Sequence, residues 1–258
     1  MALKIFHFDE INSTNVYLYD NMAEKSDISD MVVVASHQTA GRGMDKNRWE
    51  SEAGKNLLFS IALNVNFLEA ENQFKISQAV SVAIVETLAQ FIDNQKLFIK
   101  WPNDIYFGDK KLAGMLIQNT VEGCMMGLTI IGIGLNVNQI EFSKDIPNPI
   151  SLKMISGKDY DLGKLLNLLI TSIKTNVESL RFEDNQIKIN EKYISKSYRY
   201  QQWADYLYKN KVKPMIINGF DHYGRLILKD QSGEEIICDV KELQFFPPSC
   251  RQGSEADV

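Results

Sequence analysis

Short apolar runs alternate with longer stretches of helical periodicity over most of the chain. Residues 31–36 and 57–63 are rich in β-branched and other apolar side chains, which is typical of buried strands. From residue 74 to residue 92, apolar side chains recur mostly at helical spacing and predict a long core helix. The same two patterns predict strands at 3–8, 97–101, 105–107, 112–118 and 124–137, helices at 14–24 and 162–182, and a shorter polar helix that ends near 193. We therefore expect an α+β domain that ends near residue 196.

The pattern changes after residue 196. Short strand-like runs, separated by Asp-His-Tyr-Gly and Gln-Ser-Gly turns, follow at 212–220, 225–229, 235–240 and 242–246. Runs of this length and spacing predict a small β-barrel. The residues from 247 onward are polar, and we expect them to fray. The chain is thus expected to form two domains, residues 1–196 and residues 197–258.

Composition and charge limit the kinds of partner. The net charge of −5 argues against bulk binding to DNA or to acidic membranes, because such binding depends on neutralising phosphate with Lys and Arg. The 3 cysteines have no C-x-x-C spacing, so neither a disulfide framework nor a cysteine zinc site is indicated. No apolar run reaches the length of about 18 residues that a membrane span needs, and no secretory leader is evident. We expect a soluble, cytoplasmic protein.

Residues 100–104 combine groups that suit an anion and a metal ion. Lys100 directly precedes Trp-Pro, and the proline forces the strand to stop and turn, which leaves Asn103 and Asp104 at its tip. Asp104 is a candidate magnesium ligand, since Mg²⁺ typically takes one or two carboxylates together with phosphate oxygens.

The return strand of this hairpin adds a second cation. Lys111 lies in the strand, and Gly114 leaves room for a ligand or another chain segment against it. Lysines at a strand edge often serve only to prevent pairing with other strands, and Lys110 fits that interpretation. Lys100 and Lys111 are instead expected to border a pocket.

A loop with closely spaced glycines follows the first buried strand. In Gly41-Arg42-Gly43, the glycines leave backbone N–H groups accessible to a phosphate, and Arg42 adds a permanent charge. An isolated Gly-Arg-Gly is more often an ordinary turn. Trp49, a few residues later, anchors the polar segment and favours a mobile lid.

Other catalytic patterns are absent from the sequence. Gly-Ile-Gly-Leu-Asn at 132–136 lacks the third glycine of a dinucleotide loop, and no helical pattern follows it at once. The 3 histidines have no metal-ligand spacing. The chain contains neither a P-loop nor a Gly-x-Ser-x-Gly elbow. An enzyme with this sequence would work mainly by positioning and charge stabilisation.

The order of these segments is similar to that of biotin protein ligases. The matching segments are Ser13-Thr14-Asn15, the loop from Gln38 to Gly43 that ends in Trp49, Lys100-Trp101-Pro102-Asn103-Asp104, Lys111-Leu112-Ala113-Gly114 and Gly132-Ile133-Gly134-Leu135-Asn136. The resemblance implies a catalytic fold with a mixed sheet, related to class II aminoacyl-tRNA synthetases, followed by an SH3-like β-barrel. Repressor members begin with a DNA-binding domain, whereas this chain starts at the first catalytic strand and resembles the monofunctional type.

The family reaction, which the resemblance implies here, has two steps. The biotin carboxylate attacks the α-phosphate of MgATP to give biotinyl-5′-AMP and pyrophosphate. A lysine of a biotin carboxyl carrier domain, part of a biotin-dependent carboxylase, then attacks the mixed anhydride. The substrate is itself the nucleophile, so the protein needs none. Oligomeric state varies within the family, and a homodimer stays open.

The resemblance also assigns site residues position by position. Arg42 and Lys111 resemble the catalytic cations that face the carboxylate and the α-phosphate. The biotin-site positions are Ser13, Thr14, Asn15, Gln38, Gly41, Arg42, Trp49, Lys111, Gly114 and Gly132. The ATP-site positions are Arg42, Lys100, Asn103, Asp104 and Asn136, and Asp104 matches the metal position. Loop 38–49 is expected to fold over the adenylate and shield it from water.

The loop departs from the family pattern Gly-Arg-Gly-Arg-x-Gly-Arg-x-Trp. Met44, Asp45, Lys46 and Asn47 replace most of its second half, so two arginines and a glycine are missing. Lys46 or Arg48 is the candidate for replacement charge.

Two alternatives stay open from the sequence. A lipoate protein ligase shares the fold and the reaction type, although the Lys-Trp-Pro-Asn-Asp and Lys-Leu-Ala-Gly pair is the biotin form. A non-catalytic biotin-binding regulatory protein would keep the pocket without the reaction. Competition between biotin and lipoate, and formation of the adenylate, would distinguish these functions.

Overall fold

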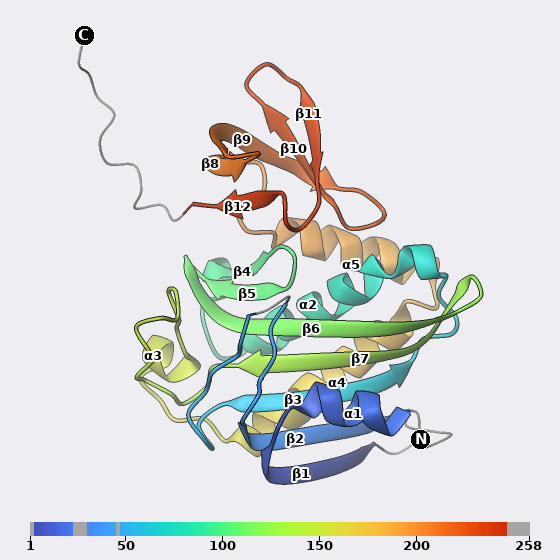
Figure 1. Ribbon diagram of the computed structural model, residues 1–258, viewed down its shortest axis with the longest axis vertical. Helices are drawn as coiled ribbons and strands as arrows, with labels where there is room; N and C mark the ends of the chain where they lie inside the picture. The colour runs from blue at the N-terminus through green and yellow to red at the C-terminus, as the bar shows by residue number, and fades with distance from the viewer. Residues whose placement is uncertain (1–2, 23–29, 45–46, 247–258) are drawn as a thin grey trace.

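The computed structural model describes residues 3–22, 30–44 and 47–246 and contains two β-sheets (Figure 1). The larger sheet has 7 strands in the order β1-β2-β3-β7-β6-β5-β4. Its strands are β1 (Lys4–Ile11), β2 (Met31–Gln38), β3 (Leu57–Asn64), β4 (Leu97–Lys100), β5 (Asp104–Phe107), β6 (Lys110–Glu122) and β7 (Met125–Leu135). β1 and β2 pair in parallel and the remaining neighbours pair antiparallel, so the sheet is mixed, as expected.

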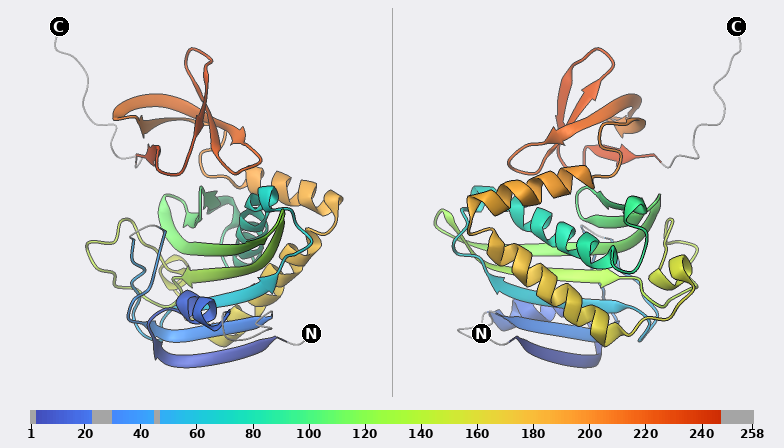
Figure 2. Two further views of the ribbon diagram at one scale, coloured as in Figure 1. Left: turned by 45° about the vertical axis from the view of Figure 1, so that its right-hand side comes forward. Right: turned by 180° about the vertical axis from the view of Figure 1, so that it is seen from behind.

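Helices cover both faces of this sheet. α2 (Phe74–Leu88), α4 (Leu162–Ser179) and α5 (Glu183–Ser195) lie on one face, as the view from behind shows (Figure 2). The apolar stripe of each of these helices packs with strand side chains in one continuous core. α1 (Thr14–Met22) covers the opposite face near β2 and β3, and the short α3 (Leu152–Ser156) lies beyond the end of β7.

Most of the expected elements are present, with shifted ends. α2 stops at Leu88 instead of 92, because the N–H groups of Gln90 and Phe91 bond to carbonyls three residues back and tighten the last turn. α1 is described to Met22, and the last predicted helical residues lie outside the described part of the chain. The predicted hairpin turn at 108–110 is confirmed between β5 and β6. Asp45, Lys46 and the polar end from 247 onward also lie outside the described residues.

The second sheet has 5 antiparallel strands in the order β11-β10-β9-β8-β12. They are β8 (Trp203–Tyr208), β9 (Lys211–Phe220), β10 (Leu226–Asp230), β11 (Glu235–Cys238) and β12 (Leu243–Phe245). Sequence analysis missed β8, although Ala204 and Tyr206 are buried in alternation with less buried neighbours. Because its sequence Trp-Ala-Asp-Tyr-Leu-Tyr does not alternate between apolar and polar residues, this pattern became visible only in the structure.

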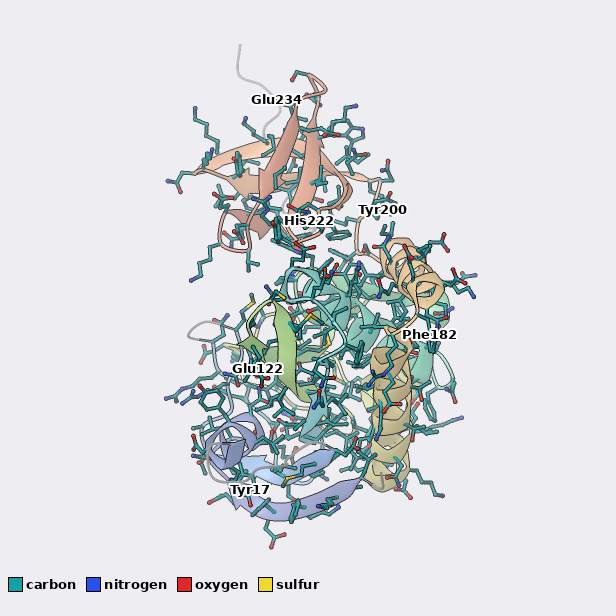
Figure 3. All side chains as sticks on the ribbon, turned by 90° about the vertical axis from the view of Figure 1, so that its right-hand side faces the viewer. Tyr17, Glu122, Phe182, Tyr200, His222 and Glu234 are labelled. Carbon is teal, nitrogen blue, oxygen red and sulfur yellow. The ribbon has the colours of Figure 1, made fainter. Side chains whose placement is uncertain are left out.

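The second sheet packs against the larger sheet where β4 ends. Trp101 belongs to the core of the second sheet, and its indole N–H donates to the carbonyl of Gly224 at 2.7 Å. Phe220 contacts Phe74 and Tyr193 with ring centroids 5.9 and 5.2 Å apart. In Figure 3 the labelled Tyr200 and His222 lie at this junction, between the two sheets. Trp101, which directly follows β4, is thus fixed by its packing and its hydrogen bond in the second sheet.

No helix in the described ranges is both long enough and apolar enough to span a membrane.

Candidate functional site

A cavity of about 290 Å³ lies where α1, the end of β2, the β5–β6 hairpin and β7 converge. These segments are far apart in the sequence, and each carries one of the motifs singled out above. The predicted site residues that line it are Ser13, Thr14, Asn15, Gln38, Arg42, Trp49, Asn103, Asp104, Lys111, Gly114 and Gly132. Gly41, Lys100 and Asn136 do not line this cavity.

Polar side chains form a connected network at the floor of the cavity. The backbone N–H of Thr14 donates to Gln38 Oε1 at 2.8 Å, and the Thr14 hydroxyl lies 2.7 Å from Ser60 Oγ. Ser60 Oγ donates to Asn15 Oδ1 at 2.5 Å, and Asn15 Nδ2 donates to the Leu116 carbonyl at 3.0 Å. Thr14, Asn15 and Ser60 are buried, so the bonds of Ser60 to the other two are protected from competition with water.

Two glycines of β7 make room for side chains that lie flat on the sheet. A Cβ at Gly132 would be 2.3 Å from Asn15 Oδ1, and one at Gly134 would be 2.3 Å from the Trp49 indole. Such distances are far below van der Waals contact, so only glycine admits both side chains. Gly134 was not among the predicted site residues, although it is part of the same Gly-x-Gly segment.

The glycine loop folds as a short hairpin beside the cavity. Trp49 N–H donates to the Gly41 carbonyl at 3.1 Å, and Gly43 N–H donates to the Asn47 carbonyl at 2.8 Å. Arg42 and Arg48 are directly paired across this hairpin, and both line the cavity. Paired residues of an antiparallel hairpin share a face, so both arginine side chains leave the hairpin on the same side. Glycine at position 41 lets the two arms of the hairpin approach closely, because a Cβ there would be 2.5 Å from the Trp49 carbonyl oxygen.

The charges around the cavity favour an anion. Arg42, Arg48 and Lys111 line it, and Asp104 is the one carboxylate among its described lining residues. Lys111 Nζ lies 2.7 Å from Asp104 Oδ1 and 5.5 Å from the centre of the Trp49 ring. The ion pair offsets one positive charge and leaves an excess of two. A ligand with a carboxylate or phosphate group would balance that excess.

Lys100 ends β4, and Asn103 directly precedes β5. Both side chains were expected to face the same ligand, but they lie in different surroundings. Asn103 lines the cavity, and its amide donates to the Met115 carbonyl at 2.6 Å. Lys100 Nζ instead donates to the Tyr106 hydroxyl at 2.9 Å and lies 5.2 Å from the centre of the Phe245 ring. Burial lowers the pKa of the Lys100 ammonium, and it raises the pKa of the Tyr106 phenol. Lys100 therefore lies against the second sheet and outside the cavity lining.

A second cavity of about 370 Å³ adjoins the first. Arg48, Trp49 and Lys111 border both cavities, and Asn136 lines only the second. The Asn136 amide donates to the Ile150 carbonyl at 3.1 Å, which ties the end of β7 to the segment before α3. Phe142, Ile146, Pro147 and Pro149 supply its apolar wall. The two cavities give space for a ligand with two parts and an anionic centre.

A metal ion would rely mainly on the ligand. Within 3–22, 30–44 and 47–246, no group of three or more His, Cys, Asp or Glu side chains gathers as a metal site. Asp104 offers a single carboxylate at the cavity wall. This is compatible with Mg²⁺, which commonly takes one or two carboxylates, substrate phosphate oxygens and water.

Two residues near the cavity, Ser60 and Val240, were not predicted from the sequence. Ser60 is the lone polar residue among the buried positions of β3, and it was treated as core. Val240, from the segment between β11 and β12, brings the second sheet to the cavity wall. A polar residue within an apolar strand was a usable signal for Ser60. No pattern in the sequence points to Val240.

Comparisons with known proteins agree with this geometry. The biotin protein ligase from Aquifex aeolicus in complex with biotin and ATP superposes with a TM-score of 0.73 and 26% identity, covering 93% of this chain and 97% of that one. This similarity confirms the expected fold: a ligase-type catalytic domain with a mixed sheet, followed by a small antiparallel sheet.

Curated relatives match over part of their length. The bifunctional ligase/repressor BirA of Escherichia coli is 31% identical over 170 residues, which are 65% of this chain and 51% of that protein. The biotin--[acetyl-CoA-carboxylase] ligase of Mycobacterium tuberculosis is 27% identical over 180 residues, which are 69% of this chain and 65% of that protein. The chain thus spans about half to two thirds of these relatives. The model of the Biotin/lipoate A/B protein ligase family matches residues 7–138, and the chain belongs to this family.

Proposed function

We propose that this protein activates biotin with ATP to biotinyl-5′-AMP and transfers the biotinyl group to a lysine of a biotin carboxyl carrier domain. The observation that carries the proposal is that Arg48 and Lys111 border both cavities, while Arg42 lines the first one with them. The choice of biotin and ATP as substrates is supported by relatives named as biotin ligases and by a solved relative described in complex with biotin and ATP.

In this proposal biotin occupies the first cavity. Its polar head would meet the network of Thr14, Asn15 and Gln38, and its apolar part would pack beneath Trp49. Gly114 and Gly132 line the same cavity and leave room for the side chains of Trp49 and Asn15 that would contact the ligand. The carboxylate would then point toward the excess of positive charge.

Adenylation requires two anions to approach each other. The biotin carboxylate attacks the α-phosphorus of ATP, and pyrophosphate leaves. Negative charge builds on the phosphoryl oxygens during this step. Lys111 and Arg42 are placed to stabilise it, and removal of one such donor typically costs about 10²- to 10³-fold in rate. Because the carboxylate of the substrate is the nucleophile, the protein contributes orientation and charge.

ATP would lie with its phosphates at the shared boundary and its adenosine in the second cavity beside Asn136. Magnesium, when bound with the nucleotide, neutralises polyphosphate charge, and Asp104 is the residue that would hold it. Asn103 belongs to the same side of the pocket. Lys100 is also assigned here to the polyphosphate by its motif, although its ammonium lies against Tyr106.

In the second step the ε-amine of the carrier lysine attacks the carbonyl carbon of the anhydride, and AMP leaves. Loop 38–49 would shield the anhydride from water until then. Val240 supports a part for the second sheet at the mouth of the pocket. A division at residue 196 and a cytoplasmic location complete this proposal, and a homodimer stays open.

Exchange of labelled pyrophosphate into ATP tests the proposal. We expect exchange that depends on biotin and is not supported by lipoate. Exchange with lipoate in place of biotin would indicate a lipoate ligase. Biotin binding without exchange would indicate a regulatory protein.

A further inference from the structure

Ser60 occupies an unusual position for a hydroxyl group. It lies in β3, where the seven positions from Leu57 to Leu63 are all buried, and its own side chain is fully buried. In the β3–β7 register it pairs with Gly132, which lines the first cavity. Ser60 does not line that cavity itself. It contacts two residues that do, Thr14 and Asn15.

Backbone groups fix the orientation of both amides in this network. The Leu116 carbonyl can only accept, so the Asn15 atom that faces it is the amide nitrogen. The Thr14 backbone N–H can only donate, so the Gln38 atom that faces it is the amide oxygen. Asn15 Oδ1 is therefore turned toward Ser60. The amide nitrogen of Gln38 donates no hydrogen bond to the residues that the structure describes.

The direction of each hydroxyl proton follows from these amides. Asn15 Oδ1 is an acceptor, so Ser60 donates its single proton to it across 2.5 Å. The oxygen of Ser60 can then accept the proton of the Thr14 hydroxyl across 2.7 Å, and Gln38 Oε1, 3.1 Å from the same hydroxyl, is a second acceptor for that proton. The hydroxyl protons of Ser60 and Thr14 are thus both directed to acceptors inside the network. The N–H groups of Gln38 and Asn15 that these bonds leave over, and the hydroxyl of Ser13, which also lines the cavity, remain to donate to a ligand.

We propose that Ser60 is a positioning residue that sets the polarity of the pocket floor, so that the floor donates hydrogen bonds and selects a ligand whose head group accepts them. This inference rests on the proposed function, in which the accepting group is the carbonyl oxygen of the cyclic urea of biotin. A ligand with the same shape but a cationic, donating head group meets donors with donors and is rejected.

The test compares biotin with 2-iminobiotin, whose protonated guanidinium replaces the urea carbonyl. Isothermal titration gives the dissociation constant of each ligand for the wild type, Ser60→Ala and Thr14→Val. In Ser60→Ala, Asn15 Oδ1 loses its donor, and we expect biotin to bind about 10-fold more weakly. The preference for biotin over 2-iminobiotin should shrink as well, whereas ATP binding should not change.

Ser197→Ala is the matched control, because Ser197 is also a buried serine and donates to the Tyr193 carbonyl at 2.8 Å away from the cavity. It should leave the ratio of the two dissociation constants at the wild-type value. A double-mutant cycle of Ser60→Ala and Thr14→Val provides a second measurement, and the combined loss should be smaller than the product of the single losses.

The outcomes separate the inference from the proposed function. No biotin binding by the wild type would overturn the proposed function. Biotin binding by the wild type with an unchanged ratio of dissociation constants in Ser60→Ala would overturn the role of Ser60. Strictly multiplicative losses in the cycle would also overturn it. If Ser60→Ala does not fold, Thr14→Val carries the same expectation for the ratio.

Discussion

An alanine at position 132 would test how the floor of the pocket is built. The new methyl carbon would lie 2.3 Å from Asn15 Oδ1 and 2.7 Å from its Cγ, so the Asn15 side chain has to leave its position. Its movement breaks the hydrogen bonds to Ser60 and to the Leu116 carbonyl. Each buried polar group left without a partner costs about 1–3 kcal/mol, and we expect Gly132→Ala to lower the free energy of unfolding by about 2–4 kcal/mol.

Urea unfolding measures this change, and titration with biotin on the folded fraction measures the effect on the pocket. We expect biotin to bind at least about 10-fold more weakly, since the floor loses a fixed donor. Gly163→Ala is the control, because Gly163 is an exposed residue in the first turn of α4, where alanine should stabilise by about 0.5–1 kcal/mol.

Combining Gly132→Ala with Asn15→Ala tests whether the two positions act on each other. With Asn15→Ala already in place, the methyl group at position 132 no longer meets the amide, and Gly132→Ala should cost much less than in the wild type. Wild-type stability and biotin affinity for Gly132→Ala would refute the account of the floor. An equal cost in both backgrounds would show that the strain lies elsewhere in the sheet.

Three further substitutions have clear expected results. Lys111→Ala should reduce biotin-dependent exchange of pyrophosphate into ATP by about 10²- to 10³-fold, and the exposed neighbour Lys110→Ala should not; normal exchange would remove Lys111 from the mechanism. Arg42→Ala should increase the escape of biotinyl-5′-AMP in a filter-retention assay, whereas Arg181→Ala, which removes a cation stacked on Phe67, should retain it; equal retention in both variants would argue against shielding by the hairpin. Tyr193→Phe removes a buried hydroxyl that has no partner among the described residues, so thermal unfolding should show equal or higher stability, and a clear loss would reveal a bond to that hydroxyl.

Much of the fold could be predicted because its signals are local. Buried apolar runs mark β2 and β3, and helical spacing marks α2 and α4. The end of α2 could not be placed, because apolar residues continue to Ile92 although the hydrogen bonds change before it. A local turn predicts the β5–β6 hairpin, but no local signal shows which distant strands pair, so the parallel placement of β1 beside β2 became visible only in the structure.

The site was predictable where residue type alone carries the chemistry. Gly132, Lys111 and Arg42 stand in short segments whose order matches the family, and the fold brings them to one cavity. Ser60 has no such mark, since a serine inside an apolar strand looks like core until its neighbours are known. Lys100 alternates with Ile99 along β4, so its side chain faces the second sheet, and only long-range packing reveals that contact.

The central claim is that biotin and ATP react in this pocket, and mass spectrometry of the bound product tests it most directly. Purified protein would be incubated with biotin, ATP and Mg²⁺, freed of unbound ligand and denatured. We predict that biotinyl-5′-AMP is recovered in near-equal amount to the protein, and that none is recovered when biotin or ATP is left out. Recovery of unreacted biotin alone would contradict the account.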